Sequence, residues 1–367
     1  MSNIIGSNIR LARLFHGLSL SDLGERLDKS KQFLSRIENG AEPVSSVLEQ
    51  ALLDELGVLP EFLRHNDPLP LTEEQCHFRR QLTTKVSLRQ YARARGEMLK
   101  RLVFVIDSYL ELPAYRILEA DPSTDESIER GAERCRMEWG LGWGPISNVT
   151  RVAESAGAVV MRVNGLATEV DAISFATRRP VIALNGMGRS ACRGRFGISH
   201  ELGHFALHIG VLTGDRLTES QANRFASALL LPRSSFLAES RIATRGTRLN
   251  WGGLSELKLR WGVSKAAILY RGRQLGIFTD EQVKSGYINL NRHGEALQED
   301  EDKDMTPENP EVITEGLRIM SEHFGMPAKT VAKEMHIQPR LLHDLLGTKP
   351  SEHMSNVVNL FAATPSP

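Results

Sequence analysis

Two histidines and a glutamate occur at a metal-binding spacing in the segment FGISHELGHFALH, residues 196–208. His200 and His204 stand four residues apart, so on a helix they lie one turn above the other on the same face. Their imidazole nitrogens could bind one ion at about 2.0–2.1 Å. Glu201 lies about 100° around the helix from His200, where its carboxylate could reach a water bound to that ion. Zn²⁺ lowers the pKa of such a water toward about 7, so Glu201 could accept its proton as the water attacks a peptide carbonyl.

A third ligand could come from the next helical segment, ESQANRFASALLLP, which begins at Glu219, 15 residues after His204. Its carboxylate could complete a His₂Glu site that leaves a fourth position for water. Asn223, one turn further on, could hold Glu219 or His200 in place. Glu219 could instead be an acid that the N-terminal end of a helix favours. His208 could replace a ligand or donate to the transition state, but we assign it a supporting or packing role around the metal.

The motif could also belong to a solvated helix whose histidines are simply hydrogen-bonded. The residues around it are apolar, which indicates a buried helix: Phe196, Ile198, Leu202, Phe205, Ala206 and Leu207. Buried histidines without partners would be costly. The apolar surroundings therefore favour the metal site.

The segments HELGHFALH and ESQANRFASALLLP resemble the ImmA/IrrE family of zinc metallopeptidases. WGLGWGPI, DAISF, RPVIALN and LKLRWGVSKAAILYRGRQLG match the same family in its usual order, so the resemblance covers roughly residues 120 to 292. It implies that His200, His204 and Glu219 bind Zn²⁺ and that Glu201 is the general base. It further implies a gluzincin-like mechanism directed at a repressor protein.

Residues 6 to 65 resemble the Xre/Cro-type helix-turn-helix domain of phage repressors, through Ile9, Arg10, Arg13 and the segments GLSLSDLGERL and KSKQFLSRIENG. In that fold the second helix of the motif lies in the major groove of DNA. The resemblance assigns this recognition helix to residues 30–39. A departure is the pair Asp28 and Lys29, which replaces the usual glycine and hydrophobic residue of the turn.

Within the recognition helix, Gln32 could read an adenine edge, because glutamine pairs with both N6 and N7. Ser30, Lys31 and Arg36 could hold phosphates. Two apolar residues of the helix are expected in the core, and Glu38 is expected to form a salt bridge with Arg10 or Arg13 rather than to contact DNA. The apolar pair is Leu34 and Ile37.

Residues 1–66 contain seven Lys/Arg and nine Asp/Glu. Non-specific DNA affinity depends on phosphate neutralisation, so it should be weak. Sequence-specific binding to double-stranded operator DNA therefore calls for a homodimer or for help from the basic stretch at residues 77–101. That stretch carries eight Lys/Arg against one acid, and it could equally be the solvated face of a connector. The domain as a whole could also be a protein-interaction module.

The chain divides into five parts. They are a helix-turn-helix DNA-binding domain (1–66), a basic helical connector (67–119), a zinc peptidase domain (120–292), an acidic linker (293–310) and a C-terminal helical region (311–367). The fold class is α+β and mostly helical, with five helices in the first part and a zincin-like domain whose small sheet accompanies the HExxH helix. Three strands are expected at AVVMRV, AISFAT and PVIALN, and GYINLN is interpreted as a closing strand. Residues 298–310 carry five acids in their first seven positions, which predicts a solvated linker.

Composition narrows the class of protein. With 45 Lys+Arg and 45 Asp+Glu the formal net charge is zero, which excludes a polybasic protein that captures nucleic acid by bulk charge. No apolar run reaches the ~18 residues of a membrane span, and the first residues do not resemble a signal peptide. Three widely spaced cysteines argue for a reducing compartment. We therefore expect a cytoplasmic protein without membrane association.

These observations lead to one main hypothesis, a DNA-binding transcriptional regulator carrying a zinc endopeptidase that cleaves a partner repressor or itself. The alternative is a non-catalytic DNA-binding repressor or antitoxin with a structural or sensory zinc site. A third hypothesis is a protease that uses its N-terminal module only to dock a repressor. An open zinc site calls for a gate, for which the acidic linker and the C-terminal helices are the candidates.

Overall fold

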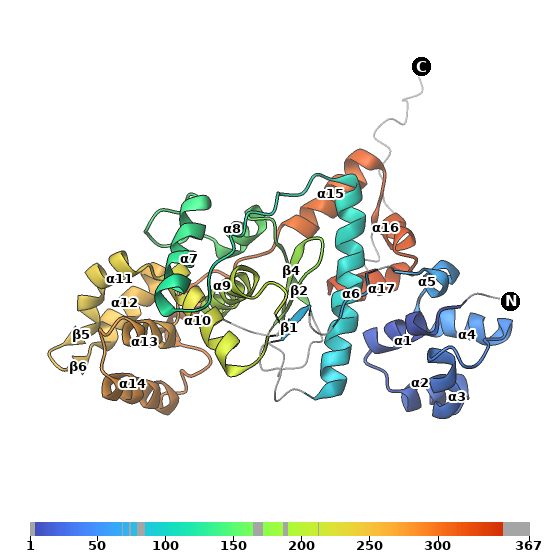
Figure 1. Ribbon diagram of the computed structural model, residues 1–367, viewed down its shortest axis with the longest axis horizontal. Coiled ribbons are helices and arrows are strands. Elements are labelled where there is room, and N and C mark those ends of the chain that lie inside the picture. The colour runs from blue at the N-terminus through green and yellow to red at the C-terminus, as the bar shows by residue number, and fades with distance from the viewer. Residues whose placement is uncertain are drawn as a thin grey trace, which may run out of the picture.

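Figure 1 shows the computed structural model, an elongated molecule with the N-terminal helices at one end and a group of helices and a hairpin at the other. The structure describes residues 4–67, 69–72, 75–78, 85–163, 172–185, 190–211 and 213–347. A mixed sheet and one long helix lie between the two ends. Within these ranges no helix is long and apolar enough to cross a membrane.

The N-terminal domain consists of five short helices, as the sequence predicts. Their bounds are α1 Gly6–Phe15, α2 Leu20–Leu27, α3 Lys31–Glu38, α4 Ser46–Leu56 and α5 Pro60–Arg64. Hydroxyl side chains begin three of them, because each accepts a hydrogen bond from a backbone N–H of the first turn. Ser19 caps α2 in a reciprocal capping box with Asp22, and Ser30 caps α3 by accepting from the N–H of Phe33.

The turn between α2 and α3 is tight. Asp28 adopts a left-handed conformation with φ of 52°, which explains why glycine is usual at this place in helix-turn-helix domains. The carbonyl of Lys29 comes so close to Gly24 that a Cβ there would lie 2.5 Å from the oxygen. Arg13 and Glu38 form the expected salt bridge, with two hydrogen bonds of 2.6 and 2.8 Å between buried side chains. This bridge fixes α1 against α3.

A four-stranded sheet forms the centre of the molecule. Its strands are β1 Cys76–Phe78, β2 Val159–Val163, β3 Ala172–Ala176 and β4 Pro180–Asn185. The order is β1-β3-β4-β2, with β1 and β4 antiparallel to β3 and with β2 parallel to β4. The three strands β2, β3 and β4 confirm the sequence prediction. β1 comes from the basic stretch and was not expected.

The sheet separates two hydrophobic cores, because successive side chains of a strand point to opposite faces. Ile173 and Phe175 of β3 belong to a core shared with the N-terminal domain and the C-terminal helices. Ala172 of the same strand belongs to a second core built from the helices of residues 125–292. Ser174 alternates with Ile173 and Phe175, so it faces the second core.

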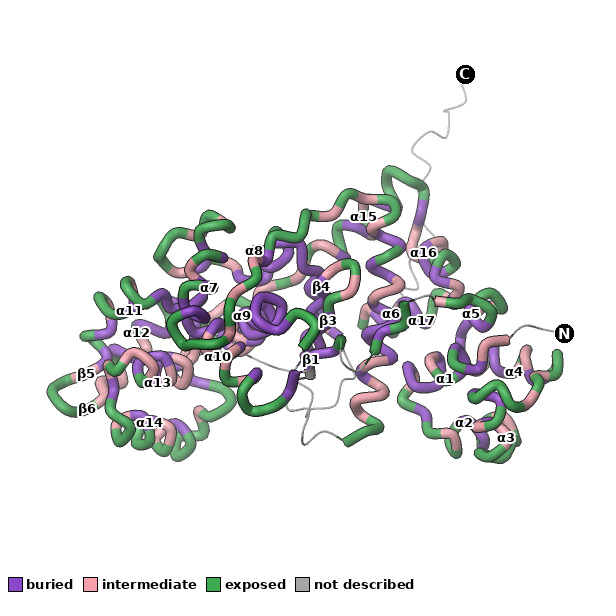
Figure 2. Tube along the Cα trace, viewed as in Figure 1, coloured by how far each residue is buried: buried purple, intermediate pink, exposed green. Residues whose placement is uncertain are grey.

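The second core is enclosed by helices and one small hairpin. Their bounds are α7 Asp125–Glu138, α8 Val149–Ser155, α9 Ala191–Leu207, α10 Arg216–Leu230, α11 Arg233–Glu239, η2 Ser240–Ala243, β5 Thr244–Arg245, β6 Arg248–Leu249, α12 Trp251–Trp261, α13 Lys265–Gln274 and α14 Asp280–Arg292. α9 crosses the middle of the molecule and is buried along most of its length (Figure 2).

The prediction of a closing strand at GYINLN is wrong, because these residues lie within α14. Thr279 and Gln282 form a capping box that begins a helix there. Val283, Gly286 and Leu290 are the buried residues of α14, and their spacing of three and four places one helical face against the core. The segment that suggested a strand is thus part of a helix, whose buried residues follow the helical period.

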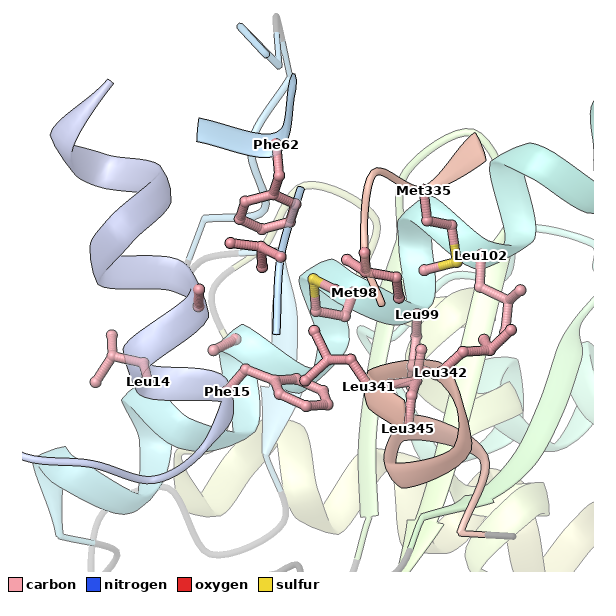
Figure 3. Packing of buried hydrophobic residues seen from close by; sticks show 14 of the residues in the cluster. Leu14, Phe15, Phe62, Met98, Leu99, Leu102, Met335, Leu341, Leu342 and Leu345 are labelled. Atoms are coloured by element: carbon pink, nitrogen blue, oxygen red, sulfur yellow. The ribbon is translucent and has the colours of Figure 1, made fainter. Parts of the chain in front are cut away.

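The long helix α6, Val86–Tyr109, joins the N-terminal domain to the C-terminal helices α15 Val312–Phe324, α16 Ala328–Glu334 and α17 Pro339–Leu346. Figure 3 shows Phe15 of α1 and Phe62 of α5 packing with Met98 of α6 and with Leu341 and Leu345 of α17. Backbone hydrogen bonds also join the two ends of the chain, since the N–H of Gln338 donates to the carbonyl of Gly57. The C-terminal helices therefore form one body with the DNA-binding domain.

Part of the acidic segment packs on the protein, where its composition predicts a solvated linker. Residues 300–304 form the short helix η3. The carboxylates of Glu299 and Asp302 accept hydrogen bonds of 2.8 and 2.5 Å from the ammonium of the fully buried Lys258 on α12. Glu308 accepts from the N–H groups of Val149 and Thr150 at the start of α8. Buried Lys258 thus neutralises Glu299 and Asp302, and the N-terminus of α8 stabilises the carboxylate of Glu308.

Candidate metal centre and nucleic-acid interface

Helices α9 and α10 approach each other closely beside the sheet. A Cβ on Gly203 would lie 3.1 Å from the carbonyl oxygen of Ala222 and 3.2 Å from the Cβ of Phe225. Only glycine therefore allows this spacing without displacement of α10. The close contact brings the first turn of α10 next to the two histidines of α9.

His200, His204 and Glu219 each offer one ligand atom, and these atoms lie within 4.8 Å of one another. The two Nε2 atoms are 3.0 Å apart, and the Glu219 carboxylate oxygens lie 3.5 Å from Nε2 of His200 and 3.3 Å from Nε2 of His204. Tetrahedral zinc with bonds of about 2.0–2.1 Å needs ligand atoms separated by about 3.3 Å. The three distances bracket this value, so the donor set fits a zinc ion. Both imidazoles are buried, and the carboxylate is partly exposed.

Hydrogen bonds to the other ring nitrogens favour the tautomers that metal binding requires. Nδ1 of His200 lies 3.0 Å from Oδ1 of Asn223, which accepts a hydrogen bond from the Nδ1–H tautomer and so favours an unprotonated Nε2. Asn223 follows Glu219 by one turn on α10, the position from which the sequence predicted support. The structure pairs it with His200.

His204 begins a longer chain of hydrogen bonds. Its Nδ1 lies 3.0 Å from Nδ1 of His208, whose Nε2 lies 2.9 Å from Oε1 of Gln221. The amide nitrogen of Gln221 donates to the carbonyl of Pro122 at 2.9 Å. The carbonyl of Pro122 can only accept, so each group in this series of hydrogen bonds donates to the next one toward Pro122. His204 therefore carries its proton on Nδ1, and its Nε2 is unprotonated. His208 thus contacts His204 and lies outside the three-residue cluster.

The carboxylate of Glu201 is fixed by β3. Ser174, which is fully buried, donates its hydroxyl proton to Oε2 of Glu201. The serine reaches α9 because alternation along β3 directs it to the metal face of the sheet. A carboxylate oxygen has more than one lone pair, so accepting the hydrogen bond from Ser174 is compatible with accepting a proton.

The edge strand β1 covers part of this site. The ring of His77 stacks on that of His204, with centroids 4.9 Å apart and planes 6° from parallel. Its Nδ1 lies 2.5 Å from the hydroxyl of Thr213. Burial lowers the pKa of His77 to about 3, with further contributions from His204 and His208. Burial also lowers the pKa of His208, so both rings are neutral near pH 7.

The residues assigned to DNA contact lie on α3, at the outer side of the N-terminal domain (Figure 1). Lys31 and Gln32 are exposed in its first turn. Ser30 is exposed too, but its hydroxyl oxygen already caps the helix. Arg36 is exposed and lies 3.3 Å from the carboxylate of Glu42. Leu34 and Ile37 are buried, which confirms their assignment to the core.

Three central cations of α6 are engaged in contacts within the protein, so neither the solvated-face nor the DNA-binding interpretation holds for them. Arg95 is buried and its guanidinium lies 3.0 Å from the carboxylate of Asp344 on α17. The ammonium of Lys100 contacts Asp67 at 2.7 Å and Glu97 at 2.8 Å. Arg101 lies over the ring of Phe62, 4.6 Å from its centroid. These cations join parts of the protein to one another.

Other members of the basic stretch, Arg79 and Arg80, lie outside the described residues. The exposed cations of α3 itself are Lys31 and Arg36.

Comparison with protein families agrees with both halves of this geometry. Residues 153–272 match the IrrE N-terminal-like domain of a metallopeptidase family, and residues 9–63 match the helix-turn-helix family. No curated protein matches the chain significantly. The two matches confirm the recognition made from sequence: the chain is a fusion of a helix-turn-helix domain with an IrrE-type peptidase-family domain. It is a DNA-binding regulator that carries a metallopeptidase-like domain.

Sequence reasoning missed four residues around the metal centre: His77, Ser174, Thr213 and Gln221. Gln221 follows Glu219 by two residues on α10. Its contact with His208 depends on how α9 and α10 cross, which the sequence does not show. Ser174 could have been suspected, because a polar residue interrupts the apolar strand DAISF. His77 and Thr213 carried no local signal, since the sheet brings residues 136 positions apart into contact.

Proposed function

We propose that this protein binds operator DNA through α3 and cleaves a partner repressor, or itself, with a zinc-dependent endopeptidase site. The observation that carries the proposal is the convergence of His200, His204 and Glu219 at zinc-ligand separations with Glu201 beside them. Regulation of gene expression would follow from removal of the repressor. The three cysteines lie in described parts of the chain, form no disulfide and are buried, in keeping with action in the reducing cytoplasm.

The proposed chemistry assigns a separate task to each group. His200, His204 and Glu219 would hold the ion, which when bound supplies a Lewis acid for the scissile carbonyl and for water. Glu201 would accept a proton from the attacking water and return it to the leaving amine. Ser174 is a positioning residue that keeps the carboxylate of Glu201 directed toward the site. The chain from His208 through Gln221 to Pro122 holds His204 in the tautomer that binds.

Metal content tests the ligand assignment. We expect about one zinc per chain in the wild-type protein by mass spectrometry and a loss of zinc in His200→Ala and in Glu219→Ala. His293→Ala is a matched control, because His293 is exposed at the end of α14. A folded wild-type protein that takes up no zinc would contradict the metal centre.

Cleavage is tested separately. Zinc-loaded protein is incubated with purified helix-turn-helix repressors, and products are identified by mass spectrometry. We expect Glu201→Gln to keep zinc and to lose cleavage by at least about 100-fold, as for a general base. If Glu201→Gln retains both zinc and regulation in cells, the alternative of a structural or sensory zinc site replaces the peptidase.

DNA binding is tested by mobility shift with the promoter region of the protein's own gene. We expect Lys31→Ala and Gln32→Ala each to weaken the shift, with the glutamine change also relaxing preference at one base pair. Light scattering with and without DNA measures whether a homodimer forms. A shift that survives both substitutions would contradict the assignment of α3 as the recognition helix.

A further inference from the structure

The two edges of the central sheet differ. The edge strand β2 packs against α15 and α17 and is therefore held by the C-terminal helices. The other edge is β1, whose described residues 76–78 pair with β3. Three residue pairs join this described part of β1 to β3. Without β1, β3 would be the edge strand, and its unpaired backbone N–H and C=O groups would lie along the edge of the sheet beside the metal centre.

The register of β1 directs one side chain into the site. Cys76 pairs with Phe175, His77 with Ser174 and Phe78 with Ile173. Cys76 belongs to the core on the α6 side of the sheet. Alternation therefore places His77 on the opposite face, where its ring stacks on His204 and reaches Thr213.

The same register connects β1 to the general base. The residue opposite His77 is Ser174, whose hydroxyl donates to the carboxylate of Glu201. An extended peptide paired with β3 at this position would have its backbone next to the serine that orients Glu201. Strand addition to a sheet edge is a general way to bind an extended peptide without dependence on its sequence.

We propose that residues 76–78 of this chain are a displaceable internal strand, which occupies the edge of β3 where an extended substrate segment of a zincin-type peptidase would pair. This inference rests on the proposed peptidase function and adds its regulation. The peptide of the repressor would replace β1, and His77 would leave the face of His204 in the same movement. The gate would thus be β1, instead of the acidic segment or the C-terminal helices expected from sequence.

Cys76 provides a reporter that does not depend on enzymatic activity, because it is fully buried while β1 is in place. In a Cys135→Ala/Cys192→Ala background it is the single thiol of the chain. We expect His77→Pro, which removes a backbone donor from β1, to increase the rate of thiol labelling at least tenfold. His293→Ala should leave the rate unchanged. An unchanged rate in a folded His77→Pro protein would overturn the proposal.

The docking site is tested in trans with a fluorescein-labelled peptide, TEEQSHFRRQLT, which covers residues 72–83 with serine in place of Cys76. Binding is measured by fluorescence anisotropy in the Glu201→Gln background, which prevents cleavage. We expect at least tenfold tighter binding when His77→Pro vacates the edge than when His77 is intact. Equal affinity for both proteins, or no binding to either, would refute the docking site.

If circular dichroism shows that His77→Pro does not fold, His77→Ala decides the question. It removes the stacking on His204 but keeps the backbone donor, so we expect at least threefold faster labelling of Cys76, and no acceleration would refute the proposal. Failure of the peptidase hypothesis is distinguishable, because peptide binding is measured with and without zinc and needs no hydrolysis. A protein that binds the peptide and never cuts a repressor would retain the docking edge and lose the enzyme.

Discussion

The salt bridge between Arg13 and Glu38 is expected to control the stability of the DNA-binding domain. Both side chains are about 5% exposed, and two hydrogen bonds join the guanidinium to the carboxylate. The guanidinium also donates to the carbonyl of Leu18, which ends the loop after α1. Glu38→Gln would leave this guanidinium buried without its counter-charge.

The magnitude follows from burial. Removing one partner of a buried ion pair costs about 3–5 kcal/mol, whereas an exposed pair contributes about 0–1 kcal/mol. We therefore expect Glu38→Gln and Arg13→Met each to destabilise the domain by about 3–5 kcal/mol. The double variant should cost less than the sum by at least about 2 kcal/mol, because neither charge is then left alone. Its remaining cost comes mainly from the unpaired carbonyl of Leu18, about 1–3 kcal/mol.

Hydrogen-exchange mass spectrometry of peptides from α1 and α3 measures this stability locally. Tryptophan fluorescence would miss it, because no tryptophan lies in residues 1–66. Glu42→Gln is the matched control. The Arg36–Glu42 pair lies in the same domain, but its side chains are 58% and 34% exposed. Costs below about 1 kcal/mol for both single variants, adding without coupling, would refute the reasoning from burial.

Three further predictions concern the C-terminal half. Lys258→Met should lower the free energy of unfolding by about 3–5 kcal/mol, because it leaves two buried carboxylates without their counter-charge. Urea titrations followed by tryptophan fluorescence measure this change. Lys303→Met, at an exposed site, should change the free energy of unfolding by less than about 0.5 kcal/mol. Leu341→Ala should cost about 2–5 kcal/mol, measured by calorimetry, since its side chain is 2% exposed in the joint core; an unchanged melting profile would contradict that core. Burial alone would raise the pKa of Glu301, but hydrogen bonds from Ser255, its own N–H and Lys265 lower it from 4.5 to about 2. Its stabilisation, up to about 3 kcal/mol, is therefore complete above about pH 4.5 and is lost as the pH falls toward 2; Glu301→Gln should weaken the dependence of urea midpoints on pH in that window, and an unaltered dependence would count against the assignment.

Several elements were predictable because their signals are local. Ser19 and Ser30 cap α2 and α3, and such caps can be read from sequence because a cap needs only the next three residues. The strands β2, β3 and β4 follow alternating apolar runs that reach a core on both faces. His200 and His204 lie on one face of α9 by helical geometry alone.

Two of the errors concern segments whose partners lie far away in the chain. Glu299 and Asp302 look solvated by composition, but Lys258, some 40 positions earlier in the chain, neutralises them. By sequence Arg95 looks available for DNA, but in the structure its guanidinium donates to Asp344, 249 positions later in the chain. Composition rules assume water as the environment of a charge, and burial against an opposite charge reverses the conclusion.

The sequence by itself determined the two domain types, the helices that bear the candidate ligands, and the types of side chain that could hold zinc. Only the tertiary structure decided which groups surround those ligands. Ser174 reaches Glu201, and His77 covers His204, because sheet register and the crossing of α9 with α10 set those contacts. Register and crossing depend on the packing of whole elements in two cores, which no single stretch of sequence encodes.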